Sequence, residues 1–150
     1  MAVSHAYALG EVPLARALQV GEALAAAGVA IMSNAPGDHP FPPLRALHDA
    51  GVRVFAGNDN IRDCWWPYGN GDLLQRAMLL GYRSGFYTDA DLMLALDMVT
   101  THAAQAIGLP QHGIAEGRPA TFVAVRADHG PAAVAGVPVE RRVVVDGRWL

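Results

Sequence analysis

The expected fold of this chain follows mainly from the stretch Val52–Gly69, VRVFAGNDNIRDCWWPYG. It opens with an apolar run, Val52–Ala56, which has the length and composition of a short buried strand. Gly57 ends that run, and a polar loop that contains Asp59 follows it. Parallel α/β proteins build their sites from residues placed just past the carboxyl ends of such strands. The stretch therefore predicts a parallel sheet with a site at its carboxyl edge.

Two similar apolar runs precede this one, and each is followed by a polar residue. Met1–Ser4 is expected to form a strand that His5 follows directly, and Val29–Ser33 a second strand that Asn34 follows. A helical pattern separates each strand from the next, so the order is β-α-β-α-β. Because such crossovers make neighbouring strands parallel, His5, Asn34 and Asp59 should meet at one edge of the sheet.

Helices are expected between and after the strands, where apolar residues recur at helical spacing. The expected helices cover residues 11–27, 43–50, 72–82 and 88–108. The helix 72–82 should be mostly buried, and the last helix begins at a capping box, Thr88–Asp91. Residues 112–125 and 139–150 are short β-branched runs with turns between them, which predicts a β-rich tail.

The composition is that of one ordinary domain. Of its 150 residues, 52% are hydrophobic and 17% charged, enough for a sizeable core. The net charge of −3 and the lack of a basic run argue against nucleic-acid binding. We expect no membrane partner, because no apolar run is long enough to span a bilayer, and no signal peptide. The single cysteine, Cys64, excludes an internal disulfide and favours a cytoplasmic location.

The motif GNDNIRDCWWPYG at residues 57–69 resembles the last-strand motif of the cytosine-deaminase branch of the amidohydrolase superfamily. Three more segments resemble that branch in the same order: VSHAYALG at 3–10, THAAQAIGL at 101–109 and GIAEGRPATFVAV at 113–125. The resemblance implies an α/β fold that comprises the last three strands of a (β/α) TIM barrel, closing helices and a short β-sandwich tail. It divides the chain into a barrel portion, 1–109, and a β-sandwich segment, 110–150.

The resemblance also implies a chemistry and residue roles. The reaction is metal-dependent hydrolysis of a carbon–nitrogen bond in a small nitrogen heterocycle, with release of ammonia or an amine. Asp59 takes the place of a metal ligand that also transfers a proton, and His5 that of the catalytic histidine. The expected metal is iron or zinc, which lowers the pKa of bound water. Position alone leaves open a turn-forming role for Asp59 and backbone bonding for His5.

The loop after Asp59 supplies the candidate substrate-binding residues. They are Asn60, Asp63, Trp65 and Trp66. The two polar side chains could read the edges of a flat ring, and one tryptophan could wall the pocket, since adjacent side chains diverge. The alternative for the tryptophans is that both pack in the core. Three other residues receive no chemical role: Asn34 is expected in a turn, His102 in packing, and Cys64 as a bystander.

Other ligands of that branch have no counterpart in this chain. The family takes two histidines from a His-x-His on its first strand, another from its fifth strand, and a glutamate as proton shuttle. A mononuclear site needs three or four protein ligands. We therefore expect this chain alone to be inactive: a sequence fragment, a truncated gene product, or a partner of the missing amino-terminal barrel portion or of a second copy. The alternative is a non-catalytic α/β half-barrel that acts as a binding or assembly module.

Overall fold

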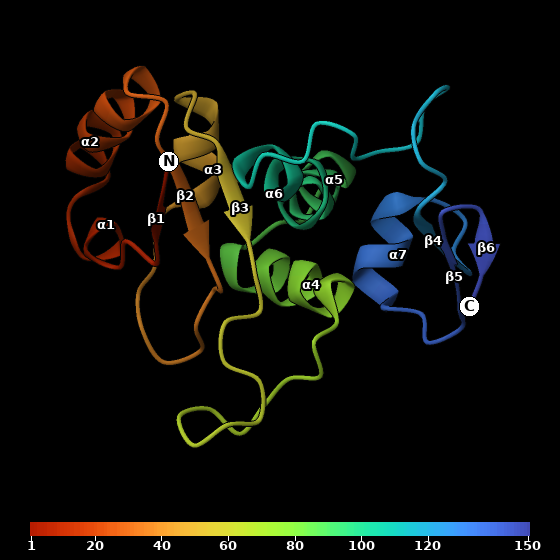
Figure 1. Ribbon diagram of the computed structural model, residues 1–150. Helices are drawn as coiled ribbons and strands as arrows, with labels where there is room; N and C mark the ends of the chain where they lie inside the picture. The colour runs from red at the N-terminus through yellow and green to blue at the C-terminus, as the bar shows by residue number, and fades with distance from the viewer.

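The computed structural model describes residues 1–150 and shows an α/β chain with two three-stranded sheets (Figure 1). In chain order the elements are β1 (Ala2–Ser4), α1 (Ala8–Glu11), α2 (Leu14–Ala26), β2 (Ala30–Ser33), α3 (Leu44–Asp49), β3 (Val54–Ala56), α4 (Leu73–Ser84), α5 (Asp89–Val99), α6 (Thr101–Ala106), β4 (Phe122–Val125), α7 (Gly130–Gly136), β5 (Arg141–Val145) and β6 (Arg148–Trp149). No helix combines the length and the apolar character needed to cross a membrane.

The first sheet holds β1, β2 and β3 in sequence order, and all its pairings are parallel. This confirms the three parallel strands predicted from the sequence. Val3, Ile31 and Val54 form one row across the sheet. The exposed fraction along that row falls from 41% at Val3 to 0% at Ile31 and Val54. Strand β1 is therefore an exposed edge, and the core lies toward β3.

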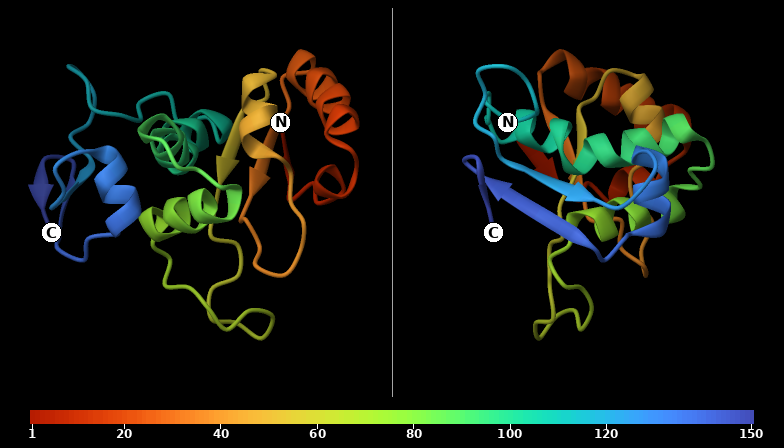
Figure 2. Two further views of the ribbon diagram at one scale, coloured as in Figure 1. Left: turned by 180° about the vertical axis from the view of Figure 1, so that it is seen from behind. Right: turned by 90° about the vertical axis from the view of Figure 1, so that its right-hand side faces the viewer.

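The core forms where helices cover the sheet. Helices α2 and α3 lie on one side of it, and α4, α5 and α6 lie beyond β3 (Figures 1 and 2). Buried residues from both groups pack on Ile31 and Val54 in one cluster, among them Leu44, Leu47, Ala77, Leu80, Leu94 and Met98. Because the helices cross over between parallel strands, the strand ends remain free to carry polar side chains.

A histidine side chain contacts the outer edge of β3. The Arg53 carbonyl accepts a hydrogen bond from β2, so the Val54 carbonyl points away from that strand. His102 on α6 places Nδ1 3.0 Å from this carbonyl and stacks on His48 of α3. Burial lowers the pKa of His48, and the neighbouring His102 lowers it further. His102 thus has the packing role expected of it.

Two helices differ from the sequence prediction. The helix expected over 11–27 begins at Leu14, after Pro13, and a separate short helix, α1, precedes it. Proline at the N-cap cannot donate to a preceding turn, so the helices stay separate. The helix expected over 88–108 is divided at Thr100, whose φ of −123° and ψ of −91° are not helical. The Thr100 hydroxyl donates to the Leu96 carbonyl instead, the local competition that threonine offers a helix.

Helix α4 is less buried than its sequence predicts. Its buried residues are Ala77, Leu80 and Gly81, whereas Tyr82 is exposed. The helix begins at the N-cap Asp72, whose side chain accepts from the Leu74 N–H. Helices α5 and α7 pack on it. The other predicted feature of this region, the capping box at Thr88 and Asp91, is confirmed.

The tail contains a helix that the sequence analysis did not predict. Strands β4, β5 and β6 form an antiparallel sheet, as the β-branched runs indicate. Helix α7 lies between β4 and β5 in the chain, with Pro131 in its first turn and His129 accepting from the Ala132 N–H. It packs against α4 and α5 and so lies between the small sheet and the rest of the chain (Figure 1). The tail is therefore mixed rather than purely β.

Candidate active site

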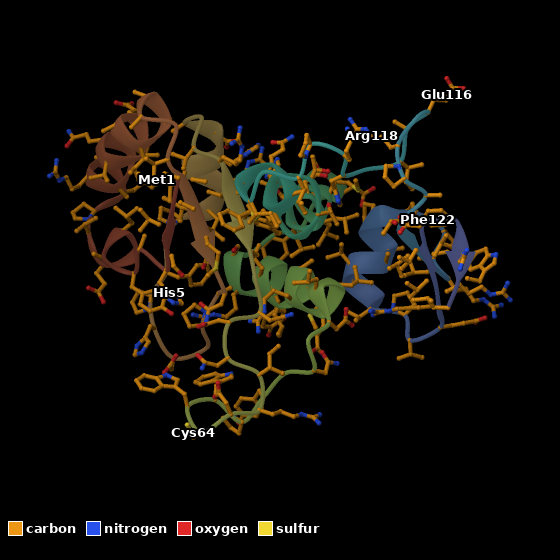
Figure 3. The ribbon with its side chains drawn as sticks, viewed as in Figure 1. Met1, His5, Cys64, Glu116, Arg118 and Phe122 are labelled. Carbon is orange, nitrogen blue, oxygen red and sulfur yellow. The ribbon has the colours of Figure 1, made fainter.

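His5 and Asp59 lie side by side beyond the carboxyl ends of β1 and β3. His5 Nε2 is 3.9 Å from Asp59 Oδ2. The side chains are 34% and 30% exposed, so both stay accessible to a small ligand. Figure 3 shows His5 at the end of the sheet from which the loop between β3 and α4 departs. The parallel sheet thus brings the two candidate catalytic residues to one edge.

The backbone is strained at this edge. His5, Ala35 and Asp59 have φ values of 68°, 48° and 58°, in the left-handed region that favours glycine. Each residue follows the end of a different strand of the parallel sheet. Strained backbone of this kind gathers at binding and catalytic sites, where the surrounding structure holds it in place. The strain therefore marks the same edge as the histidine–carboxylate pair.

Tyr7 and Asn34 complete a polar ring with the pair. The Tyr7 hydroxyl lies 3.0 Å from His5 Nδ1 and 3.4 Å from Asn34 Oδ1. The Asn34 amide donates to Asp59 Oδ2 at 3.0 Å. Sequence analysis did not single out Tyr7 and expected Asn34 only in a turn. The signal for Asn34 was its place after a strand; Tyr7 had none beyond its closeness to His5.

The Tyr7 hydroxyl has a single proton to donate within this ring. Burial raises the pKa of Tyr7, and the Asp59 charge raises it further, so the hydroxyl stays protonated at neutral pH. Asn34 Oδ1 can only accept, so the hydroxyl donates its proton to that oxygen. The roles in the contact between the Tyr7 hydroxyl and His5 Nδ1 depend on the tautomer of the imidazole. The ring thereby links His5 to Asp59 through Tyr7 and Asn34.

Arg76 reaches the same edge from α4. Its guanidinium donates to the Asn34 carbonyl at 2.6 Å and to the Asn58 carbonyl at 3.1 Å. Its Nε donates to the Asn58 side chain at 3.4 Å. Burial lowers the pKa of Arg76, and the charge on Asp59 works against that shift. No sequence pattern pointed to Arg76, because its acceptors are brought together only by the fold.

The loop that carries the candidate substrate-binding residues projects from the body as a long arm (Figures 1 and 2). Asp63 shapes its turn: the carboxylate accepts from the backbone N–H groups of Trp65 and Trp66, at 2.9 and 2.8 Å. The Asn60 amide donates to the same carboxylate at 2.6 Å. The Asn60 hydrogen bond, together with those from the backbone, lowers the pKa of Asp63. The two polar candidates thus bind each other.

The two tryptophans have different surroundings, and neither belongs to the core. Trp65 is 81% exposed, and Trp66 is partly buried with its ring edge-on to Tyr68 at 5.6 Å. Cys64 lies exposed at the far end of the arm (Figure 3). No hydrogen bond joins the arm's four candidate residues to His5 or Asp59. The structure therefore groups the six predicted site residues into two sets.

The chain supplies only part of the ligand set of a metal site. Asp59 Oδ1 accepts no hydrogen bond from the protein, and His5 offers an imidazole beside it. Carboxylate and imidazole are ligands that iron and zinc accept. No group of three histidine, cysteine, aspartate or glutamate side chains is arranged to hold a metal ion. The donors fit such a metal in kind, but they make up only part of a ligand set.

A parallel sheet with a histidine–carboxylate pair at its carboxyl edge suits a hydrolase of the α/β class. The model of the amidohydrolase family matches residues 2–150. The chain therefore belongs to the amidohydrolase family, and its relatives include enzymes of the cytosine-deaminase branch.

Solved structures of this family superimpose closely on the chain. N-isopropylammelide isopropylaminohydrolase from Burkholderia multivorans has 39% sequence identity and a TM-score of 0.94 over 99% of this chain. 5-Methylcytosine deaminase from Klebsiella pneumoniae, liganded with 5-fluorocytosine, has 26% identity and a TM-score of 0.88 over the same share. A curated relative, N-isopropylammelide isopropyl amidohydrolase of Pseudomonas sp. (strain ADP), is 33% identical over 124 residues, 80% of this chain.

The chain is much shorter than these relatives. It spans 30% of the Pseudomonas protein, 38% of the Burkholderia chain and 40% of the Klebsiella chain. The superposition therefore concerns one part of each relative.

Proposed function

We propose that this chain forms the carboxyl-terminal part of a metal-dependent amidohydrolase that hydrolyses a carbon–nitrogen bond of a small nitrogen heterocycle. The observation that carries the proposal is the His5–Asp59 pair at the carboxyl edge of a parallel sheet in a chain of this family. The relatives' names supply the substrate class, since they act on N-isopropylammelide and 5-methylcytosine. A location in the cytoplasm, favoured by the single cysteine, is part of the proposal.

In this proposal Asp59 binds the metal and relays a proton, while His5 orients the attacking water. A divalent iron or zinc ion would supply Lewis acidity and lower the pKa of bound water. Asp59 can contribute Oδ1 because Asn34 engages the other oxygen. His5 Nε2 lies 3.9 Å from the Asp59 carboxylate, and Nδ1 of the same ring contacts the Tyr7 hydroxyl. Both side chains are accessible enough to exchange protons with a small ligand.

The arm between β3 and α4 is the proposed substrate-binding element. Trp65 and Trp66 offer flat apolar faces on which a heterocycle can stack. Asn60 retains a carbonyl oxygen for a ring N–H group, while its amide is held by Asp63. Asp63 would act through the shape of the turn it organises rather than by touching the ring.

His5 and Asp59 are too few to hold a metal ion, so further ligands would have to come from a partner chain. We propose that residues 1–109 are the last three strands and closing helices of a (β/α) barrel, and that 110–150 belong to a β-sandwich. The exposed edge at β1 is where a preceding barrel strand would pair. An amino-terminal barrel portion, or a second copy of this chain, would supply the missing ligands. This chain alone should show little or no turnover.

The test uses the purified chain of residues 1–150, alone and mixed with the complementary amino-terminal portion of the Burkholderia relative. Metal content is measured after addition of iron or zinc, and N-isopropylammelide, cytosine and 5-methylcytosine are assayed. We expect turnover only in the mixture, and its loss in Asp59→Ala but not in Asp128→Ala, an exposed carboxylate between β4 and α7. Turnover that survives Asp59→Ala, or phosphoester hydrolysis without deamination, would contradict the proposal.

The exposed edge of β1 also favours a second function, that of a non-catalytic assembly module. An unpaired strand edge binds another strand without any chemistry. Stable association with the amino-terminal portion, without turnover on any of the heterocycles, would support this alternative.

A further inference from the structure

Arg76 connects the segment that follows β2 with the segment that follows β3. Its Nη1 donates to the Asn34 carbonyl after β2, and its Nη2 and Nε donate to Asn58 after β3. Figure 1 shows why this is possible: α4 lies beside the arrowhead end of β3. A guanidinium offers its donors in a rigid fork, so the three bonds fix the two segments relative to each other.

The fixed segment after β2 in turn holds the Asp59 carboxylate. Asn34 is bonded by Arg76 through its backbone carbonyl, which leaves its side-chain amide free to donate to Asp59 Oδ2 at 3.0 Å. Asp59 itself follows Asn58, whose carbonyl is bonded by the same guanidinium. Both partners of the Asn34–Asp59 hydrogen bond are therefore tied to one arginine.

Arg76 occupies a position in its helix where an arginine is unfavourable unless its contacts compensate. Arg76 lies in the first turn of α4, where the helix dipole is positive and a cation is unfavourable. The guanidinium is also partly buried, which lowers its pKa. Both effects oppose an arginine here, whereas the hydrogen bonds to Asn34 and Asn58 and the attraction of the Asp59 charge favour it.

We propose that Arg76 is a positioning residue for Asp59: it holds the backbones of Asn34 and Asn58 so that the Asn34 amide engages Oδ2 and Oδ1 stays free for a ligand. The inference rests on the proposed function only for the identity of that ligand, a metal ion. The geometry it assigns concerns this chain alone and can be measured without any activity.

The experiment is NMR spectroscopy of the purified chain without metal. We expect the Asn34 side-chain amide protons to exchange slowly with solvent in the wild type. In Arg76→Met, the same protons should exchange about tenfold faster, because the segment that presents them is released. Arg83→Met is the matched control, since Arg83 is on the same helix and also donates to a backbone carbonyl, that of His39, but makes no hydrogen bond to Asn34 or Asn58. Its Asn34 amide should behave as in the wild type.

The outcomes separate positioning from simple stabilisation. If Arg76 only stabilises the fold, Arg76→Met will lower the free energy of unfolding but leave Asn34 amide exchange in the folded chain unchanged, and the proposal is wrong. If Arg76→Met does not fold, Arg76→Lys replaces it, because an ammonium keeps the charge but not the fork. In the wild type, scalar couplings across the hydrogen bonds from the guanidinium to the Asn34 and Asn58 carbonyl carbons should be detectable. Their absence would also overturn the proposal.

An activity measurement then tests the link to function separately. Where the mixture with the amino-terminal portion turns over a heterocycle, Arg76→Met should weaken metal binding more than Arg83→Met does. A mixture without any turnover would contradict the proposed function and leave the NMR result on Arg76 standing.

Discussion

Arg141 donates two hydrogen bonds to the Asp72 carboxylate, at 2.7 and 2.6 Å, and so ties strand β5 to the first turn of α4. Asp72 is also the N-cap of that helix and accepts from the Leu74 N–H at 2.9 Å. One carboxylate therefore begins the helix that carries Arg76 and anchors the tail of the chain. The two ends of this contact are 69 residues apart in the sequence.

Removal of this contact should destabilise the chain. Arg141→Met leaves a partly buried carboxylate with fewer donors, and we expect the free energy of unfolding to fall by about 2 kcal/mol. Urea unfolding followed by circular dichroism measures the change. Arg126→Met removes an arginine from an exposed pair with Glu140 and should change stability by less than about 0.5 kcal/mol. Equal losses of unfolding free energy in the two variants would show that the Arg141–Asp72 contact stabilises the chain no more than an exposed ion pair does.

The same contact makes stability depend on pH. The hydrogen bonds from Arg141 lower the pKa of Asp72 below its usual value. An aspartate with a lowered native pKa stabilises the folded chain above its unfolded pKa, and this stabilisation is lost as the pH falls through the native pKa. The stability difference between wild type and Arg141→Met should therefore be full at pH 7 and shrink below about pH 4. A difference that stays constant between pH 7 and pH 3 would contradict this.

Asp63 should control the arm without affecting the rest of the fold. Asp63→Ala removes the acceptor for two backbone N–H groups and for the Asn60 amide. We expect residues 61–68 to become more mobile on the nanosecond timescale, while the stability of the chain stays nearly unchanged because Asp63 is exposed. Heteronuclear NOE values report the mobility, and Arg62→Ala, on the same arm, is the control. Unchanged NOE values in Asp63→Ala would show that the turn does not depend on this carboxylate.

His102 should be a stability residue. His102→Phe keeps an aromatic ring near His48 but leaves the Val54 carbonyl without its donor, so we expect a loss of about 1–3 kcal/mol. His112→Phe changes an exposed histidine beyond α6 and should leave thermal unfolding nearly unchanged. A His102→Phe variant as stable as the wild type would mean that solvent or another group satisfies the edge of β3.

Much of the fold could be predicted because its signals are local. The apolar runs that precede His5, Asn34 and Asp59 needed only their own composition to be identified as strands, and the crossover rule then made them parallel. The Thr88–Asp91 capping box is likewise complete within four residues. The same local signals placed His5 and Asp59 at one edge of the sheet.

The features that the sequence analysis missed depend on contacts between distant residues or on a single local hydrogen bond. The break at Thr100 follows from one hydroxyl that bonds its own helix, and nothing in the apolar periodicity marks it. Helix α7 gains its stability by packing on α4 and α5, which are distant in the chain. Arg76 carried no sequence signal of its role, since its acceptors on Asn34 and Asn58 meet only in the folded chain.

The left-handed backbone at His5, Ala35 and Asp59 lowers the stability of the chain. At His5 and Asp59 the proposed reaction nevertheless requires the side chain. A residue with a side chain costs about 1 kcal/mol more than glycine in this conformation. Glycine at His5 or Asp59 would relieve that cost and delete the side chain on which the proposed reaction depends. A random library of this chain that is selected only for foldedness should therefore drift toward glycine at these positions. A library selected for turnover in a reconstituted enzyme should keep histidine and aspartate. The positions at which the two libraries diverge would be those where a side chain is retained for activity although it lowers stability.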